Sequence, residues 1–242
     1  MNICLFTPEE INKPLSKKDP RGTHIISILH KTEGCKFFCG IINGSSGEAT
    51  ISKIDEENIY FTFEPTGDGK TLYPLKMIIG FPRPIQLKRL LRDMASLGVE
   101  EVHLCATELG EKSYLSSDLA TTDAGTQMLT DGTVQAASTH VPQLFIHKSL
   151  KECLQSFDKT EYTKIALDNI DAKCSLSSYL NQNNAQKVIA AIGSERGWSG
   201  NERKLLEQNG FTRTSMGKRV LRTETAATVS ASIILDSFGV LD

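Results

Sequence analysis

The chain has 242 residues, which is enough for one large domain or two unequal ones. Its hydrophobic fraction of 39% and charged fraction of 23% are those of an ordinary folded globular protein. No apolar stretch approaches the roughly 20 residues needed to cross a bilayer, so we expect no membrane association. The net charge of −2 leaves a nucleic-acid partner open, because a phosphate-binding face needs only a local excess of Lys and Arg.

The sequence contains six cysteines, and we interpret them as reduced thiols. The first residues show no basic segment followed by an apolar one, so we expect no secretory route to an oxidising compartment and predict a cytoplasmic location. Cys35 and Cys39 have no second close pair of Cys or His ligands that would complete a tetrahedral zinc site, and Cys105 lies in an apolar, strand-like run. The spacing therefore predicts no metal site.

The first part of the chain alternates short β-prone runs with turn-forming residues, which predicts a small β-barrel or sandwich. The runs are 24–29, 36–42, 48–54 and 59–63. A cluster of turn-forming residues at 65–69 follows, and after it the pattern of short β-prone runs changes. We place the domain boundary there, with a first domain over 1–69 and a second over 70–242.

From residue 72 onward β-like runs alternate with helical ones, which is typical of an α/β domain with a mainly parallel sheet. The expected strands are 76–81, 101–105, 143–146, 164–167 and 187–192. Apolar residues at helical spacing over 87–97 predict a helix that ends at Gly98. A final helix over about 223–236 is predicted to turn Ala226, Val229, Ile233 and Ile234 to one side.

Two glycine-containing loops in the second domain indicate a small-molecule site. The run at 188–192 is a buried strand that breaks at Gly193, and a helix is expected to open near Ser199. Ligands of α/β domains bind at such strand-to-helix junctions, and glycine lets the backbone approach a ligand closely. The glycine spacing is not the dinucleotide fingerprint, and plain turn residues are the alternative interpretation.

The second loop runs from Met216 into the N-terminal turn of the final helix. Thr223 is expected to cap that helix, and Glu224 suits the positive end of its dipole. Each of these features has an ordinary structural explanation when it is taken alone.

Together the two loops resemble a known family. Gly-Ser-Glu-Arg-Gly-Trp-Ser at 193–199 is similar to the Gly-Pro-Glu-Gly-Gly-Phe-Ser loop, and Leu-Arg-Thr-Glu-Thr-Ala at 221–226 matches the Leu-Arg-x-Glu-Thr-Ala loop, of the RsmE-type 16S ribosomal RNA methyltransferases. These enzymes belong to the SPOUT superfamily and methylate N3 of a uridine. Weaker similarities extend over nearly the whole chain, including Arg21-Gly22-Thr23-His24 at the start of an RNA-binding PUA-like domain.

The resemblance implies a SPOUT-type α/β knot, with a C-terminal trefoil knot and a mainly parallel sheet, preceded by a small PUA-like β-barrel that binds RNA. It also implies an S-adenosylmethionine cofactor, ribosomal RNA or the small ribosomal subunit as partner, and a homodimer with the active site at the subunit interface. The implied cofactor-binding residues are Ile192, Gly193, Ser194, Glu195, Met216, Gly217, Leu221, Arg222, Thr223, Glu224, Thr225 and Ala226. The implied RNA-binding residues are Arg21, His24 and Arg83, the last aligning loosely with a family lysine.

The substrate side departs from the family pattern. An arginine expected near the substrate is replaced by Ser138, and Arg196 stands where the family loop has its second glycine. We hypothesise that Arg196 supplies the missing cation, and we assign catalytic roles to Arg196, Ser138 and Arg222. His140 is a weaker candidate for the catalytic base, because a lone histidine is more often structural.

Two other functions remain open. The altered substrate loop is compatible with a knotted methyltransferase that acts on a different RNA nucleotide or atom. A catalytically weak RNA-binding or ribosome-assembly factor that keeps the cofactor pocket is the second alternative.

Overall fold

The computed structural model describes residues 2–157 and 161–241 and divides into two compact units. The first unit comprises the chain up to Thr71 together with Thr130–Val141, and the second comprises Leu72–Leu129 and the chain from Pro142. The first unit thus extends two residues beyond the predicted boundary at residue 69 and includes Thr130–Val141, which the prediction assigns to the second domain. The boundary at Leu129 falls within helix α4 (Ala124–Gln135).

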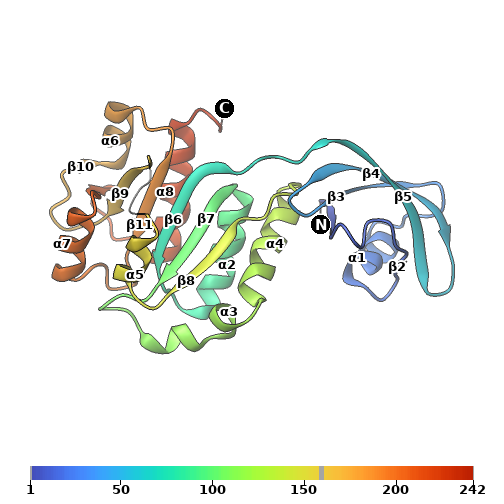
Figure 1. Ribbon diagram of the computed structural model, residues 1–242, viewed down its shortest axis with the longest axis horizontal. Coiled ribbons are helices and arrows are strands. Elements are labelled where there is room, and N and C mark those ends of the chain that lie inside the picture. Colours follow the sequence, from blue (N-terminus) through green and yellow to red (C-terminus); the bar gives the residue numbers. More distant parts are fainter. Residues whose placement is uncertain (1, 158–160, 242) are drawn as a thin grey trace. The chain divides into compact units, whose positions relative to one another are not determined.

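The first unit is built on a five-stranded sheet in the order β1-β3-β4-β5-β2 (Figure 1). Its strands are β1 (Cys4–Phe6), β2 (Leu15–Ser16), β3 (Lys36–Ile41), β4 (Ser45–Ile54) and β5 (Asn58–Asp68). β1 and β3 run parallel, and the other pairs are antiparallel. Alternate residues of these strands, with Ile11 from the turn between β1 and β2 and the helical residue Ile25, form the core: Cys4, Phe6, Ile11, Leu15, Ile25, Phe37, Cys39, Ala49, Ile51 and Ile59.

Two local predictions for this unit are wrong. The run 24–29 is helical: α1 (Pro20–Thr23) continues into a π-helical segment (His24–Ile28). The Asp19 side chain caps this helix and Pro20 occupies its first turn, which are strong helix-start signals. Only one side of the helix is covered, since Ile25 is buried whereas Ile28 is 63% exposed.

The cluster at 65–69, expected to be a turn, is mostly strand. β5 continues to Asp68 and pairs with the start of β4, with Gly67 opposite Ser46 and Pro65 opposite Gly47. A β-bulge between Ser46 and Gly47 accommodates the irregular register, and a Cβ atom on Gly47 would lie 2.1 Å from the Glu64 carbonyl oxygen. The small residues therefore allow close pairing of two strands instead of ending one.

The second unit contains a seven-stranded sheet in which every pair of neighbouring strands is parallel, in the order β10-β12-β9-β11-β6-β7-β8. The five expected strands are present as β6 (Tyr73–Gly80), β7 (Val99–Cys105), β8 (Gln143–His147), β9 (Thr163–Leu167) and β11 (Val188–Ile192). The strands β10 (Cys174–Ser175) and β12 (Thr212–Ser215) were not predicted. Both are short and polar, so they lack an apolar alternation that would reveal them.

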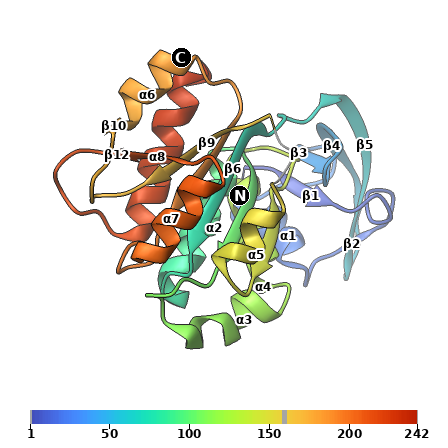
Figure 2. The same cartoon turned by 60° about the vertical axis from the view of Figure 1, so that its left-hand side comes forward.

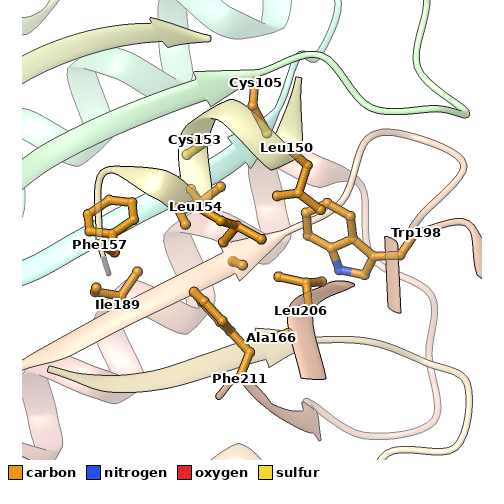
Figure 3. Packing of buried hydrophobic residues seen from close by; sticks show 12 residues of the cluster. Cys105, Leu150, Cys153, Leu154, Phe157, Ala166, Ile189, Trp198, Leu206 and Phe211 are labelled. Atoms are coloured by element: carbon orange, nitrogen blue, oxygen red, sulfur yellow. The ribbon is translucent and has the colours of Figure 1, made fainter. Parts of the chain in front are cut away.

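Helices cover both faces of this sheet (Figures 1 and 2). One face carries α2 (Pro84–Ser96) and α8 (Thr223–Ser237). The other face carries α5 (Leu150–Gln155) and α7 (Gly200–Gln208). These two helices share a buried core with Ile189 and Trp198 (Figure 3). The remaining helical segments are a 3₁₀ turn (Lys112–Ser116), α3 (Asp118–Thr121) and α6 (Leu176–Asn183).

The buried face of α8 agrees with the prediction at Ala226 and Ile234 but not at Val229 and Ile233. Its buried residues are Thr223, Ala226, Ala227, Ser230, Ala231, Ile234 and Leu235, whereas Val229 is 37% exposed. Small residues form most of this face, which lets the helix lie close to β6, β11 and α2. The prediction placed Val229 and Ile233 on this face because they are large and apolar, and it left out the small residues Ala227, Ser230 and Ala231.

Arg21 holds the start of the first unit together. Its guanidinium donates five hydrogen bonds, to the Leu5 carbonyl and to the carboxylates of Glu10 and Asp19, at 2.8–3.0 Å. It also lies over the Phe6 ring, 4.8 Å from the centroid. Hydrogen bonds from Arg21 lower the pKa values of both Glu10 and Asp19.

Arg21→Ala is expected to lower the free energy of unfolding by about 2–3 kcal/mol, because two partly buried carboxylates lose their partner. The folded pKa values of both acids are depressed, so their stabilising effect is present at neutral pH and is lost as the pH falls below about 4.5. The variant should therefore show a weaker loss of stability in acid. Urea unfolding at several pH values measures both effects, with exposed Lys18→Ala as control. Equal stability of the two variants at neutral pH would contradict the assignment.

Candidate functional site

The carboxyl ends of three neighbouring strands enclose a pocket in the second unit. Loops after β9, β11 and β12 form its walls, and the first turn of α8 closes one side. The lining residues are Leu167, Asp168, Asn169, Ile170, Ile192, Gly193, Ser194, Glu195, Arg196, Gly197, Trp198, Arg203, Met216, Arg219, Val220, Leu221, Thr223 and Ala226. This is the edge of a parallel sheet at which α/β folds bind ligands.

The loop after β11 is a tight backbone turn that requires glycine. Ser194 and Gly197 form an isolated bridge, with the Gly197 N–H donating to the Ser194 carbonyl at 2.8 Å, and Gly197 has a φ of +72°. A Cβ atom on Gly193 would lie 2.8 Å from the Gly197 carbonyl carbon. Gly80, at the end of β6, lies below the same loop, where a Cβ atom would be 2.4 Å from the Ser194 nitrogen.

Thr223 links the two loops that the sequence had singled out. Its hydroxyl donates a hydrogen bond to the Gly193 carbonyl at 3.3 Å, and the residue is buried. The expected role of Thr223 as helix cap is wrong: Arg222 is the N-cap residue of α8, and it makes no side-chain capping bond. The threonine hydroxyl instead fixes the first turn of α8 against the loop after β11.

The helix that follows the loop opens where the sequence indicated. Ser199 is the N-cap residue of α7 and forms a reciprocal capping box with Glu202. The buried Glu202 carboxylate also accepts a hydrogen bond from the Glu108 backbone N–H at 2.8 Å. This single carboxylate therefore fixes the start of α7 to the segment that follows β7.

Sequence reasoning missed the contribution of the loop after β9. Asp168 directly follows that strand, is 9% exposed, and accepts hydrogen bonds from Arg203 Nε at 2.6 Å and Nη2 at 3.2 Å. Trp198 Nε1 donates to the Leu167 carbonyl at 3.1 Å and ties the loop after β11 to the end of β9. An acidic residue at the carboxyl end of a predicted parallel strand was the signal that could have identified Asp168.

Most of the predicted cofactor residues line this pocket. They are Ile192, Gly193, Ser194, Glu195, Met216, Leu221, Thr223 and Ala226, and Arg196 lies with them. Arg222 and Glu224 line an adjoining hollow with Arg83, Gln86 and Glu195. Gly217, with a φ of +96°, and exposed Thr225 are not among the lining residues.

The predicted catalytic and RNA-binding residues occupy different environments. Arg196 is exposed and borders both the pocket and a hollow with Tyr114 and Glu111. Arg83 forms an exposed ion pair with Glu195, with 3.3 Å between Nε and Oε1. Ser138 belongs to the first unit, where its hydroxyl donates to the Lys70 carbonyl at 3.1 Å.

The two predicted RNA-binding residues of the first unit also differ. All the N–H groups of the Arg21 guanidinium are engaged within the protein, so its observed role is structural. His24 lines a hollow of the barrel, and its buried Nε2 atom has no hydrogen-bond partner among the described residues.

Comparison with known proteins defines the class first. The family model for an RNA methyltransferase domain matches residues 70–235. A putative methyltransferase from Legionella pneumophila, solved in complex with S-adenosylmethionine, superposes with a TM-score of 0.79 at 18% identity and covers 98% of each chain. A ribosomal RNA small subunit methyltransferase E from Neisseria gonorrhoeae, bound to S-adenosylmethionine, gives the same TM-score and identity, covering 98% of this chain and 97% of that one. The fold is thus that of SPOUT-type RNA methyltransferases with a small PUA-like domain, as the sequence predicted.

Sequence relatives then define the family. The chain is 40% identical to ribosomal RNA small subunit methyltransferase E of Treponema pallidum, over 97% of this chain and 91% of the relative. It is 34% identical to ribosomal RNA small subunit methyltransferase E 1 of Borreliella burgdorferi, over 98% of each chain. The chain belongs to the ribosomal RNA small subunit methyltransferase E family, which confirms the resemblance found in its two loops.

Gly193→Ala is expected to destabilise the protein by about 1–3 kcal/mol, because the new methyl group overlaps the Gly197 backbone. Gly200→Ala is the matched control, since a Cβ atom there meets nothing within 4 Å. Chemical denaturation of both variants measures the difference. Equal stability of the two variants would show that the loop relaxes freely around residue 193.

Proposed function

We propose that this protein transfers a methyl group from S-adenosylmethionine to N3 of a uridine in small-subunit (16S) ribosomal RNA. The observation that carries the proposal is the pocket built by the loops after β9, β11 and β12, two of which hold the motifs shared with the family. The names of the relatives and the cofactor in the two similar structures support the same reaction.

The pocket fits the cofactor chemically. Ile192, Leu221 and Ala226 provide apolar contacts for a nucleoside, and Gly193 provides a bare backbone that a side chain would block. The lining carries both signs of charge, in the carboxylate of Glu195 and the cations of Arg196 and Arg219, whereas the carboxylate of Asp168 is already paired with Arg203. A ligand with both an ammonium and a carboxylate group finds complementary partners there.

S-adenosylmethionine supplies an electrophilic methyl group on a sulfonium. In the transfer, the bond between N3 and the methyl carbon forms as the sulfur–carbon bond breaks. The electron pair stays on sulfur, and the N3 proton leaves to a base. The protein must position the uracil in line with the methyl group and stabilise negative charge on the ring. Exposed Arg196, at the border of the pocket, is the residue that we assign to this charge.

RNA binding is assigned to the first unit and to the cations beside the pocket. The hollow that contains His24 is also lined by Lys31, Lys36 and Phe38, and Phe38 is 45% exposed. A cation beside an exposed aromatic ring suits contact with phosphate and with a stacked base. Arg83 supplies positive charge in the second unit. Ser138 remains a proposed substrate contact.

A homodimer is proposed as the working form. Ile85 and Val220 are 75% and 81% exposed, and Val229 on α8 is 37% exposed, so the second unit presents apolar surface that a second copy would cover. A cytoplasmic location is proposed from the ribosomal substrate. No helix in the described part of the chain is long and apolar enough to cross a membrane.

Deletion of the gene is expected to remove 3-methyluridine from small-subunit ribosomal RNA, and the purified protein with labelled S-adenosylmethionine should restore it. Chromatography and mass spectrometry of the nucleosides, with mapping of the modified position, measure both. Loss of a different methylated nucleoside would favour a knotted methyltransferase with another target. Cofactor binding by calorimetry without any transfer of label to free RNA or to subunits would favour an assembly factor.

Arg196→Ala is expected to lower kcat by about 10²–10³-fold while the affinity for S-adenosylmethionine changes less than threefold, because the cation acts on charge that develops during transfer. Lys204→Ala, an exposed cation on α7, is the control for general loss of positive charge. Steady-state methylation assays and calorimetry provide the two readouts. Unchanged turnover with intact cofactor affinity would remove Arg196 from the mechanism.

A further inference from the structure

A row of ionisable side chains lies on the face of the seven-stranded sheet that α5 and α7 cover, next to α5. Glu101, His103 and Cys105 alternate along β7, so all three point to the same face. In the parallel register, Cys105 lies beside His147 at the end of β8. Among the residues that line the pocket of the proposed methyl transfer, none belongs to this row.

The two histidines face each other through ring nitrogens. His103 Nδ1 lies 3.0 Å from His147 Nε2, and the rings are stacked with 12° between their planes. The other ring nitrogen of His103, Nε2, lies 2.8 Å from Glu101 Oε2, and Lys76 Nζ lies 2.7 Å from Glu101 Oε1. The carboxylate therefore favours a proton on His103 Nε2 and leaves a lone pair on Nδ1.

Cys153, in α5, is the third member of the group formed with His103 and His147. It lies in α5 with no exposed surface, and one donor atom from each of His103, His147 and Cys153 lies within 4.8 Å of the others. Figure 3 shows Cys153 and Cys105 on the same side of the core.

We propose that His103 Nδ1, His147 Nε2 and Cys153 Sγ form a binding site for a thiophilic divalent cation of the zinc type. Tetrahedral zinc with nitrogen ligands at about 2.0–2.1 Å separates those nitrogens by about 3.3 Å, close to the distance observed here. A carboxylate on the second ring nitrogen of a metal-bound histidine is the usual supporting contact of such sites, and Glu101 occupies that place.

The site has a structural role in this fold. Its ligands come from β7, β8 and α5, and α5 is a helix of only six residues at the β8 edge of the sheet. Bonds from one ion to all three elements would add to the apolar contacts of Leu150 and Leu154 that hold the helix on the sheet. Spacing in the sequence could not reveal the site, because the ligands at 103, 147 and 153 form no close pairs of the zinc-finger type.

Wild-type protein refolded with Co²⁺ under reducing conditions is expected to bind one equivalent. Its spectrum should show a thiolate-to-cobalt charge-transfer band and the intense visible bands of tetrahedral coordination. Zn²⁺ should displace the cobalt and raise the melting temperature. Refolding in the presence of the ion is used because the ligands are buried. Absence of the charge-transfer band and of a stoichiometric ion in wild-type protein would overturn the proposal.

Three variants separate the ligands from their surroundings. Cys153→Ser should abolish the charge-transfer band, and His147→Gln should weaken cobalt binding by more than about 100-fold. Glu101→Gln, which changes only the supporting carboxylate, should weaken it by about 10–100-fold. Cys174→Ser is the matched control, because Cys174 lies in β10, at the opposite edge of the sheet from β8, and should bind cobalt like wild type. Circular dichroism establishes folding of each variant, and folded Cys153→Ser with an unchanged cobalt spectrum would also overturn the proposal.

Discussion

The close approach of backbone between the end of β6 and the loop after β11 is the constraint on which the second unit depends. Gly80 and Gly193 leave no space for a side chain, and Gly197 makes the turn that closes the loop. Because the loop lies directly on β6, the Gly193 carbonyl is positioned to accept the Thr223 hydroxyl, which in turn places the first turn of α8. The pocket between the three loops follows from these contacts, so its shape is determined mainly by backbone.

The remaining walls of the pocket are fixed by polar side chains that are already paired within the protein. Asp168 is neutralised by Arg203, and Glu202 is occupied by two backbone N–H groups. These carboxylates hold loops in place, so the exposed residue Arg196, which stands where the family loop has its second glycine, can differ from the family without disturbing them.

The sequence predicted the second unit better than the first for physical reasons. Long apolar runs such as 187–192 identify buried parallel strands, and the family loops identify the ligand edge of their sheet. Short strands such as β10, with two residues, carry no periodic signal. The run 65–69 has the composition of a turn. It nevertheless forms a strand, because the residues of β4 that lie opposite it are equally small.

The candidate site shows the same division. Residues of the two loops were found because they are contiguous in the sequence, whereas Asp168 contributes through a contact with Arg203 that only the fold creates. Thr223 was recognised as important but was given the wrong partner. A threonine at a helix start suggests a cap, and only the three-dimensional position of Gly193 shows that its hydroxyl bonds to another loop.

The Thr223–Gly193 hydrogen bond also has a consequence for the order of folding. It joins residues 30 positions apart, and the chain between them must first lay down α7 and β12. Closing a loop of this length loses conformational entropy before any contact compensates for it, and parallel pairings between distant strands form slowly for the same reason. The pocket is therefore complete only once α8 has docked against the loop after β11. A chain with its sheet largely complete but α8 not yet docked would be compact and rich in secondary structure, yet unable to hold a ligand.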